Sequence, residues 1–370
     1  MLIIDGDYPM AFGAVDLNRD LTLPIEEARA AEPSWSSDEI WLDSGIMATL
    51  PELRKAQIAA ALVKVGGRIS RPGNPLKGYR TGEIAYAVAH GQLDYYRILE
   101  AQGEARLLKT KSEFSEHMRS WSQAEEHSDL PIGFVLGMEG ADPILHPAQV
   151  HDWWDDGIRV VSLTHYGIST YAHGTGTGTE GGLIPPAKEL LQEMESCGMI
   201  LDLTHLSDAS IRQAIEIFAG PLIASHQNCR ALTPGERQFP DDILKSIIDR
   251  GGVIGSSMDT WMLYRPGLSD WSNIPSRRDV FPREAVTLED FADHIDYVCQ
   301  LAGNANHAAI GGDTDGQSGK DGAPFEIDTV ADYQKLVEVL ERRGYSSEDI
   351  ENVMYRNWQR FYETWLMTDD

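Results

Sequence analysis

The chain has 370 residues, of which 42% are hydrophobic, so it is long enough to bury a large core. Its formal net charge of −27 argues against nucleic acid or an anionic membrane surface as a partner, because no basic field offsets the repulsion between like charges. No apolar run approaches the ~18 residues that a membrane-spanning helix needs. Residues 1–5 lack the basic region and cleavage site of a signal peptide. Three scattered cysteines, Cys197, Cys229 and Cys299, are therefore expected to be reduced thiols in a cytoplasmic protein.

Short apolar runs alternate with amphipathic helical patterns along the chain. The expected strands are residues 2–4, 132–136, 160–163, 199–203, 222–224, 253–254 and 308–310. The expected helices are residues 186–197, 207–218, 241–250, 288–302 and 330–342. Strands that alternate with helices indicate βαβ units and a parallel sheet.

Seven or eight such units predict an α/β fold of the (β/α)8 TIM-like barrel type. We expect one catalytic domain over residues 1–370, with long loops near 71–82, 171–185 and 261–286. The first and last of these segments are rich in Gly or Pro, and the last could cover an active site. The glycine-rich stretch 174–182 lacks the Gly-Lys-Ser/Thr ending of a phosphate-binding loop, so we interpret it as an ordinary loop.

Ionisable residues directly follow the expected strands. In a barrel of this type the chemistry lies where strands end and the following loops begin. The residues at these positions are Asp5, Asp7, Glu139, His165, His205, His226, Asp313 and Asp315. Any one of them alone could be a structural histidine or a capping aspartate, but strand ends converge at the barrel mouth. Imidazole nitrogens and carboxylate oxygens gathered there suit zinc and similar metals, which activate a bound water and polarise a carbonyl.

The same positions carry motifs that resemble those of the membrane (renal) dipeptidase family of metal-dependent, amidohydrolase-like barrels. The motifs are Gly137-Met138-Glu139-Gly140, Leu163-Thr164-His165, Asp202-Leu203-Thr204-His205-Leu206-Ser207, Ser225-His226 and Gly311-Gly312-Asp313-Thr314-Asp315-Gly316. They occur in the order of that family and at similar separations, and Arg356-Asn357-Trp358 extends the resemblance to the last helix. The resemblance therefore covers nearly the whole chain.

The resemblance implies a site for two metal ions. Glu139 would bridge the two ions, and His205 and His226 would bind the second one. The family opens with Asp-Gly-His-x-Asp, whose histidine and final aspartate bind the first metal, but this chain has Asp5-Gly6-Asp7-Tyr8-Pro9. Aligned without a gap, Asp7 replaces the histidine; with a two-residue deletion, Asp7 becomes the aspartate.

Both alignments remove the histidine from the first metal site. That site would keep Asp7 and the Glu139 bridge, with Asp5 as a helper, and would bind zinc more weakly because it is poorer in nitrogen. His173, in the glycine-rich loop, could supply a nitrogen if that loop folds inward. We therefore expect one or two zinc ions, with the first position empty or holding another divalent metal.

The resemblance also implies the residues that handle the substrate. His165 would contact the substrate and the tetrahedral intermediate, and Asp313 would carry a proton between the attacking water and the leaving amine. Arg237 would hold the substrate carboxylate, with Arg230 as the rival for that role. Asp315 would orient its neighbours.

These expectations lead to one main hypothesis and two alternatives. The main one is a metal-dependent hydrolase that cleaves the amide bond of dipeptides or dipeptide-like N-acyl amino acids, with a homodimer suggested by the resemblance. One alternative is a single-metal amidohydrolase acting on a substrate that is not a dipeptide. The other is a non-catalytic binding protein derived from the barrel.

Overall fold

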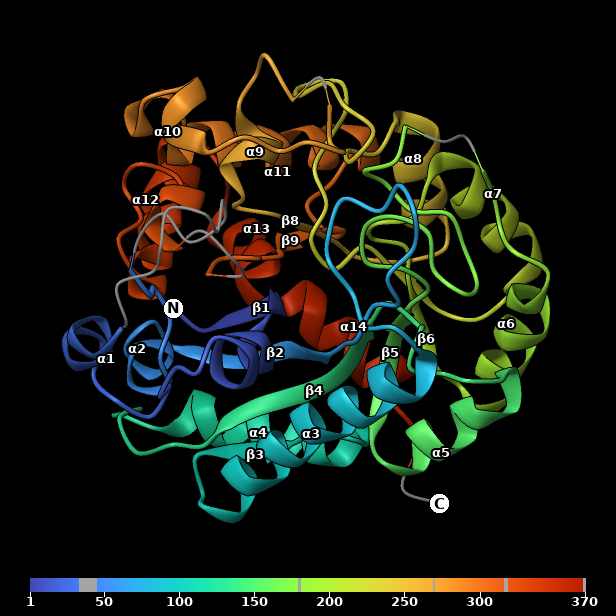
Figure 1. Ribbon diagram of the computed structural model, residues 1–370. Helices are drawn as coiled ribbons and strands as arrows, with labels where there is room; N and C mark the ends of the chain where they lie inside the picture. Colours follow the sequence, from blue (N-terminus) through green and yellow to red (C-terminus); the bar gives the residue numbers. More distant parts are fainter. Residues whose placement is uncertain (33–44, 179–180, 269, 316–318, 369–370) are drawn as a thin grey trace.

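Parallel strands surrounded by helices form the centre of the protein in the computed structural model, which describes residues 1–32, 45–178, 181–268, 270–315 and 319–368 (Figure 1). The strands are β1 (Ile3–Tyr8), β2 (Ile58–Val65), β3 (Ala105–Leu107), β4 (Ile132–Glu139), β5 (Ile158–Ser162), β6 (Ile200–Asp202), β7 (Leu222–Ile223), β8 (Ile254–Ser256) and β9 (Ala308–Ile310). Every residue of β1 and β2 is buried, as expected for strands covered on both faces.

Helices enclose the strands on the outside. They are α1 (Ile25–Ala31), α2 (Leu50–Lys55), α3 (Gly82–Ala101), α4 (Lys111–Gln123), α5 (Val150–Asp155), α6 (Pro186–Cys197), α7 (Asp208–Ile217), α8 (Asp241–Asp249), α9 (Thr260–Leu263), α10 (Arg277–Val280), α11 (Leu288–Ala302), α12 (Lys335–Arg342), α13 (Ser347–Glu351) and α14 (Asn357–Trp365). None of the helices in the described ranges is long and apolar enough to cross a membrane.

The strand order makes the sheet a barrel. Strands β1, β2, β4, β5, β6 and β7 pair side by side and in parallel, while β3 pairs with the start of β4. A bridge between Ala224 and Ile254 joins β7 to β8, and β8 pairs with β9. The circle is completed where the backbone N–H of Asp313 donates to the carbonyl of Asp7, at 3.0 Å. The predicted (β/α)8-type barrel is therefore confirmed.

Glycines allow three strands to approach the centre of the barrel. A Cβ atom on Gly6, Gly255 or Gly311 would lie 2.6, 2.2 or 2.3 Å from the carbonyl oxygen of Ser225. These distances are far below van der Waals contact, so a side chain at any of the three positions would force the strands apart. The glycine between Asp5 and Asp7 is thus required by packing.

Most predicted elements are confirmed with small shifts at their ends. The helices predicted over 186–197 and 288–302 agree with α6 and α11, whereas the one predicted over 330–342 starts as a 3-10 turn and becomes α12 at Lys335. The prediction missed β2, although Ile58–Val65 is an apolar run. It also missed α3 and α4, which flank β3.

The segments expected as long loops are less uniform. Residues 261–286 contain most of α9 together with α10 and a short 3-10 turn. Residues 179–180, 269 and Gly316, which belong to predicted loops or motifs, lie outside the described residues. The C-terminal motif is bonded to β9 and the turn before it: the Asn357 amide donates to the carbonyls of Ala305 and Ala308, and the Trp358 indole donates to that of Ile310.

Candidate metal centre

The carboxyl ends of the strands bring together the residues that the sequence scattered over more than 200 positions. Glu139 ends β4, and its Oε1 lies 3.3 Å from His205 Nε2 and 3.5 Å from His226 Nε2. The two Nε2 atoms are 2.9 Å apart. Three donor atoms thus face one point at the barrel mouth.

This spacing fits one metal ion. Donors at the corners of a tetrahedron around zinc, with bonds of about 2.1 Å, lie about 3.4 Å apart. Two imidazole nitrogens that face each other at 2.9 Å also need a shared proton or cation between them. His165 Nε2 lies 3.8 Å from Glu139 Oε2, beside this position. Glu139, His205 and His226 would hold the ion.

The charge states suit a metal as well. Burial, with help from the Arg237 guanidinium, lowers the pKa of His205 well below its usual value, so this imidazole is neutral and free to bind a cation. Burial opposes ionisation of Glu139, but His165, Lys64 and His205 outweigh it and hold its pKa well below the ordinary range. The residues Glu139, His205 and His226 therefore offer a metal ion one anionic oxygen and at least one neutral nitrogen.

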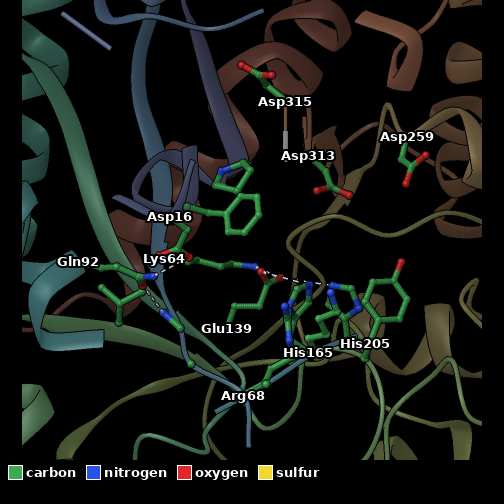
Figure 2. Close-up of a pocket in the computed structure, with 18 of the residues that line it drawn as sticks. Asp16, Lys64, Arg68, Gln92, Glu139, His165, His205, Asp259, Asp313 and Asp315 are labelled. Carbon is green, nitrogen blue, oxygen red and sulfur yellow. Dashed lines mark hydrogen bonds and ion pairs between the residues drawn. The ribbon is translucent and has the colours of Figure 1, made fainter. Parts of the chain in front are cut away.

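Lys64, near the end of β2, reaches the same cluster from the other side (Figure 2). Its Nζ lies 2.5 Å from Asp7 Oδ1, 3.4 Å from Glu139 Oε1 and 3.2 Å from Asp202 Oδ2, and donates to the Ser225 hydroxyl at 2.9 Å. Burial favours the neutral amine, but the three carboxylates hold the pKa of Lys64 well above its usual value. The Lys64 ammonium and the imidazoles of His205 and His226 therefore all contact the same oxygen of Glu139.

Asp7 lies beside this ammonium. Its Oδ1 is also 3.3 Å from His226 Nδ1, so Asp7 contacts the outer nitrogen of a candidate ligand. Asp5 points elsewhere: its Oδ1 accepts the backbone N–H of Asp7, and burial raises its pKa well above the usual value. Asp5 therefore shapes the strand end.

Asp313 faces the same space from the loop after β9. Burial raises its pKa to about 7, with Asp7 and Asp259 adding to the effect and His226 opposing it. Its Oδ2 accepts a hydrogen bond from Ser257 at 3.2 Å. A carboxyl group with a pKa near neutrality can both give and take a proton.

Asp315 has a different setting. Its carboxylate binds Arg19 at 3.1 Å and the backbone N–H groups of Met47 and Ala48, so it ties the β9 loop to the N-terminal segments. Burial raises its pKa to about 6. The orienting role that the resemblance implied for Asp315 stays a prediction.

The two arginines predicted from the sequence are placed differently. Arg237 is fully buried: it donates to Gln227 Oε1 at 2.5 Å and to the His226 carbonyl at 3.2 Å, and lies 3.5 Å from His205 Nε2. Arg230 pairs with Asp208 at 2.7 Å on the surface of α7. Of these two arginines, therefore, only Arg237 contacts the residues of the candidate metal centre.

A cavity of about 480 Å³ opens over the cluster. Its lining includes Lys64, Arg68, Glu139, His165, His205 and Asp313, together with Tyr166, Asp259 and Arg277. Figure 2 shows Glu139 between Lys64 and the imidazoles of His165 and His205, with Asp313 and Asp259 across the opening. Neither Arg237 nor His173 belongs to the lining; the ring of His173 lies against Gly181 instead.

Arg68 is the guanidinium that the sequence did not reveal. It lies just after β2, lines the cavity and contacts His165 Nδ1 through its NH1 group. Burial lowers the pKa of His165 to about 3, and Arg68 adds to this effect against Glu139. His165 is therefore neutral, and its Nε2 faces Glu139.

The missed residues fall into three groups. Lys64 and Arg68 belong to a strand and loop that the sequence reading passed over, although a lysine near the end of the apolar run Ile58–Val65 was a usable signal. Asp202 and Ser225 lay inside recognised motifs. Nothing in the sequence of Tyr166 or Asp259 distinguished them from their neighbours.

An α/β barrel whose strand-end carboxylate and histidines converge on one point has the architecture typical of metal-dependent hydrolases. The sequence pattern described as membrane dipeptidase (Peptidase family M19) matches residues 87–366, so the chain belongs to this family. It is 32% identical over 230 residues to dipeptidase aclJ of Aspergillus oryzae, a match that covers 61% of this chain and 50% of the relative. It is 30% identical over 265 residues to dipeptidase verJ of Clonostachys rogersoniana, covering 70% and 59%. The chain spans about half the length of these curated relatives.

Solved structures with the same fold extend over the whole chain. The dipeptidase AC, a metallo peptidase of family M19, superposes with a TM-score of 0.75 at 22% identity, covering 99% of both chains. A metallo peptidase from Rhodobacter sphaeroides, solved with a phosphinate mimic of the dipeptide L-Ala-D-Ala, gives a TM-score of 0.73 at 20% identity, again over 99% of both chains. At these identities the similarity establishes the fold.

Proposed function

We propose that this protein is a metal-dependent dipeptidase that cleaves the amide bond of dipeptides or dipeptide-like N-acyl amino acids. The observation that carries the proposal is the convergence of Glu139 Oε1, His205 Nε2 and His226 Nε2 within 2.9–3.5 Å of one another at the barrel mouth. Family membership supports it, as do the curated relatives named dipeptidases and the related structure that holds a dipeptide mimic.

A zinc ion held by these three residues would supply an activated water and polarise the scissile carbonyl. The residues around it would do the rest. Asp313, with a pKa of about 7, would hold a proton at its carboxyl group and deliver it to the departing amine. Neutral His165 would bind the developing oxyanion through Nε2 when that nitrogen carries the proton, since Arg68 donates to Nδ1. The cavity walls would exclude bulk water.

The substrate carboxylate needs a cation. We propose Arg237 for this role, because its NH2 group is 3.5 Å from His205 Nε2 and so lies next to the metal ligands. Arg68 is the second candidate, since it lines the cavity whereas Arg237 does not.

We also propose a cytoplasmic homodimer; the three cysteines are free thiols, which fits a reducing compartment.

A dipeptide screen tests the function. Protein reconstituted with zinc should release free amino acids from several dipeptides, including a pair that differs only in the stereochemistry of the C-terminal residue. Glu139→Gln and His205→Gln should abolish release, whereas Lys188→Met, an exposed change on α6, should not affect it. Metal-replete protein that binds dipeptides without cleaving any would favour the non-catalytic alternative, and cleavage confined to other amides would favour the single-metal amidohydrolase.

A further inference from the structure

Lys64 takes no part in the chemistry proposed above, yet it is the most heavily paired cation at the barrel mouth. It lies on β2, opposite Gly137 in the register with β4, and Gly137 has no side chain to compete for the space. The Lys64 side chain is 3% exposed. Burying a lysine is costly unless charged partners surround it, so this placement requires an explanation.

Its partners account for all of the donors of the ammonium. Nζ contacts Asp7 at 2.5 Å, the Ser225 hydroxyl at 2.9 Å, Asp202 at 3.2 Å and Glu139 at 3.4 Å. An ammonium has three N–H donors, so none is left for a substrate. Lys64 is therefore built into the site as a fixed positive charge.

The contacts of Lys64 coincide with a potential metal position. The ligand atoms of Asp7, His226 and Asp313 lie within 4.8 Å of one another, close enough for one ion to bind all three. An ion there would bond an Asp7 oxygen at about 2.0–2.2 Å. Lys64 Nζ already stands 2.5 Å from Asp7 Oδ1 and 3.5 Å from His226 Nδ1. The ammonium and an ion bound to the same oxygen would repel each other at short range.

The ligands Glu139, His205 and His226 remain available to a metal ion. Oε1 of Glu139, which contacts Lys64 on one side, faces His205 and His226 on the other. One carboxylate oxygen thus lies between a protein cation and the position that suits a metal.

We propose that the Lys64 ammonium replaces a metal ion at Asp7, so that the chain binds a single divalent ion, at Glu139, His205 and His226. The inference rests on the proposed function only in that a metal binds to these three residues. It explains why β1 lacks a histidine: an ammonium is held by carboxylates and hydroxyls and needs no nitrogen ligand.

Metal content tests this inference without an activity assay. The full chain, purified without affinity-metal resin and stripped with a chelator, would be equilibrated with excess Zn²⁺, freed of unbound ion by gel filtration and measured by plasma mass spectrometry. We expect one zinc per chain in the wild type and in Lys188→Met. Two per chain in the wild type would overturn the role of Lys64 but leave the proposed function intact; none would contradict the proposed function itself.

Two variants locate the replaced position. Lys64→Met removes the ammonium at similar length and should raise the content to two zinc ions per chain, and adding Asp7→Asn should return it to one. A folded Lys64→Met protein that stays at one ion would overturn the inference. If Lys64→Met fails to fold, titration of the wild type with Co²⁺ decides: the visible absorption should stop rising at one equivalent, and a break at two would contradict the proposal.

Discussion

At the scale of single residues, the site depends on how burial and neighbours set each charge. His205 is buried and His165 is half-buried, and both are kept neutral, whereas Glu139 keeps its charge because cations and imidazoles surround it. The pKa of Asp313 is held at about 7 because burial and the carboxylates of Asp7 and Asp259 oppose its ionisation. Groups so close together with such different proton affinities are typical of catalytic sites.

Replacing Asp313 by asparagine tests its role as the proton carrier. The amide cannot exchange a proton, so we expect kcat on a cleaved dipeptide to fall about 10²- to 10⁴-fold. Zinc content should stay unchanged, because Asp313 is not among the residues proposed to hold the ion. Steady-state kinetics together with metal analysis would check both points; a variant that retains full kcat would remove Asp313 from the mechanism.

The carboxylate-binding residue can be identified by comparing Arg237→Gln with Arg68→Gln. A charged hydrogen bond contributes about 1.5–3 kcal/mol, so we expect Arg237→Gln to lower kcat/KM about 10- to 100-fold. The loss should appear with a free dipeptide and be much smaller with its C-terminal amide. If only Arg68→Gln shows this dependence on the carboxylate, the residue that lines the cavity binds the substrate and the assignment of Arg237 is wrong.

At the scale of elements, the strand ends place the ligands, and glycines let the strands meet. Gly6, Gly255 and Gly311, from or beside three different strands, surround the Ser225 carbonyl and keep β1, β8 and β9 close to β7. This contact sets where Asp7 and Asp313 project. Because backbone atoms make the contact, no side-chain adjustment can relieve a clash there.

Gly255→Ala should therefore destabilise the protein. The added Cβ would lie 2.2 Å from a backbone oxygen, and we expect the free energy of unfolding to fall by at least ~2 kcal/mol. Gly91→Ala is the matched control: it lies within α3, has nothing within 4 Å of its Cβ position, and should raise stability by about 0.5–1 kcal/mol. Urea unfolding followed by circular dichroism would measure both, and equal effects would contradict the packing argument.

At the scale of the whole molecule, 58 acidic residues outnumber 31 lysines and arginines, whereas the cavity at the barrel mouth is nearly balanced, lined by five acidic residues and four lysines or arginines. The protein as a whole is strongly anionic, and its cavity carries only a small share of that excess of negative charge. Buried histidines away from the site, such as His294 and His117, tie the shell of helices to the barrel.

His294 should make stability depend on pH. Burial lowers its pKa to about 3, and its Nδ1 accepts the backbone N–H of Cys229, whereas an unfolded histidine titrates near 6.5. Between these values the unfolded chain binds a proton that the native protein does not. The contribution is therefore complete above about pH 6.5 and is lost as the pH falls, at up to about 1.4 kcal/mol per pH unit.

Unfolding by urea at several pH values between 4.5 and 7.5, at constant ionic strength, would measure this slope. His294→Gln should show a slope smaller by up to one proton below about pH 6.5 and the same slope above it, whatever its effect on stability at neutral pH. Parallel curves for the two proteins would show that His294 does not titrate as proposed.

The sequence by itself determined the alternation of strands and helices, the barrel, the family likeness and the strand-end residues Glu139, His205, His226 and Asp313. It could do so because these features are local: an apolar run, a helical period, or a polar residue after a strand. It also determined that β1 lacks a histidine. It did not determine what takes the place of that histidine.

Only the tertiary structure decided that question. Lys64 is 57 residues from Asp7 and 75 from Glu139 along the chain, and its meaning depends on the register of β2 between β1 and β4. Arg237 and Arg68 likewise differ in access to the cavity, although both are arginines in loops that follow strands of the barrel. Charge compensation and access depend on distances between residues far apart in sequence, and the closing of the barrel sets those distances.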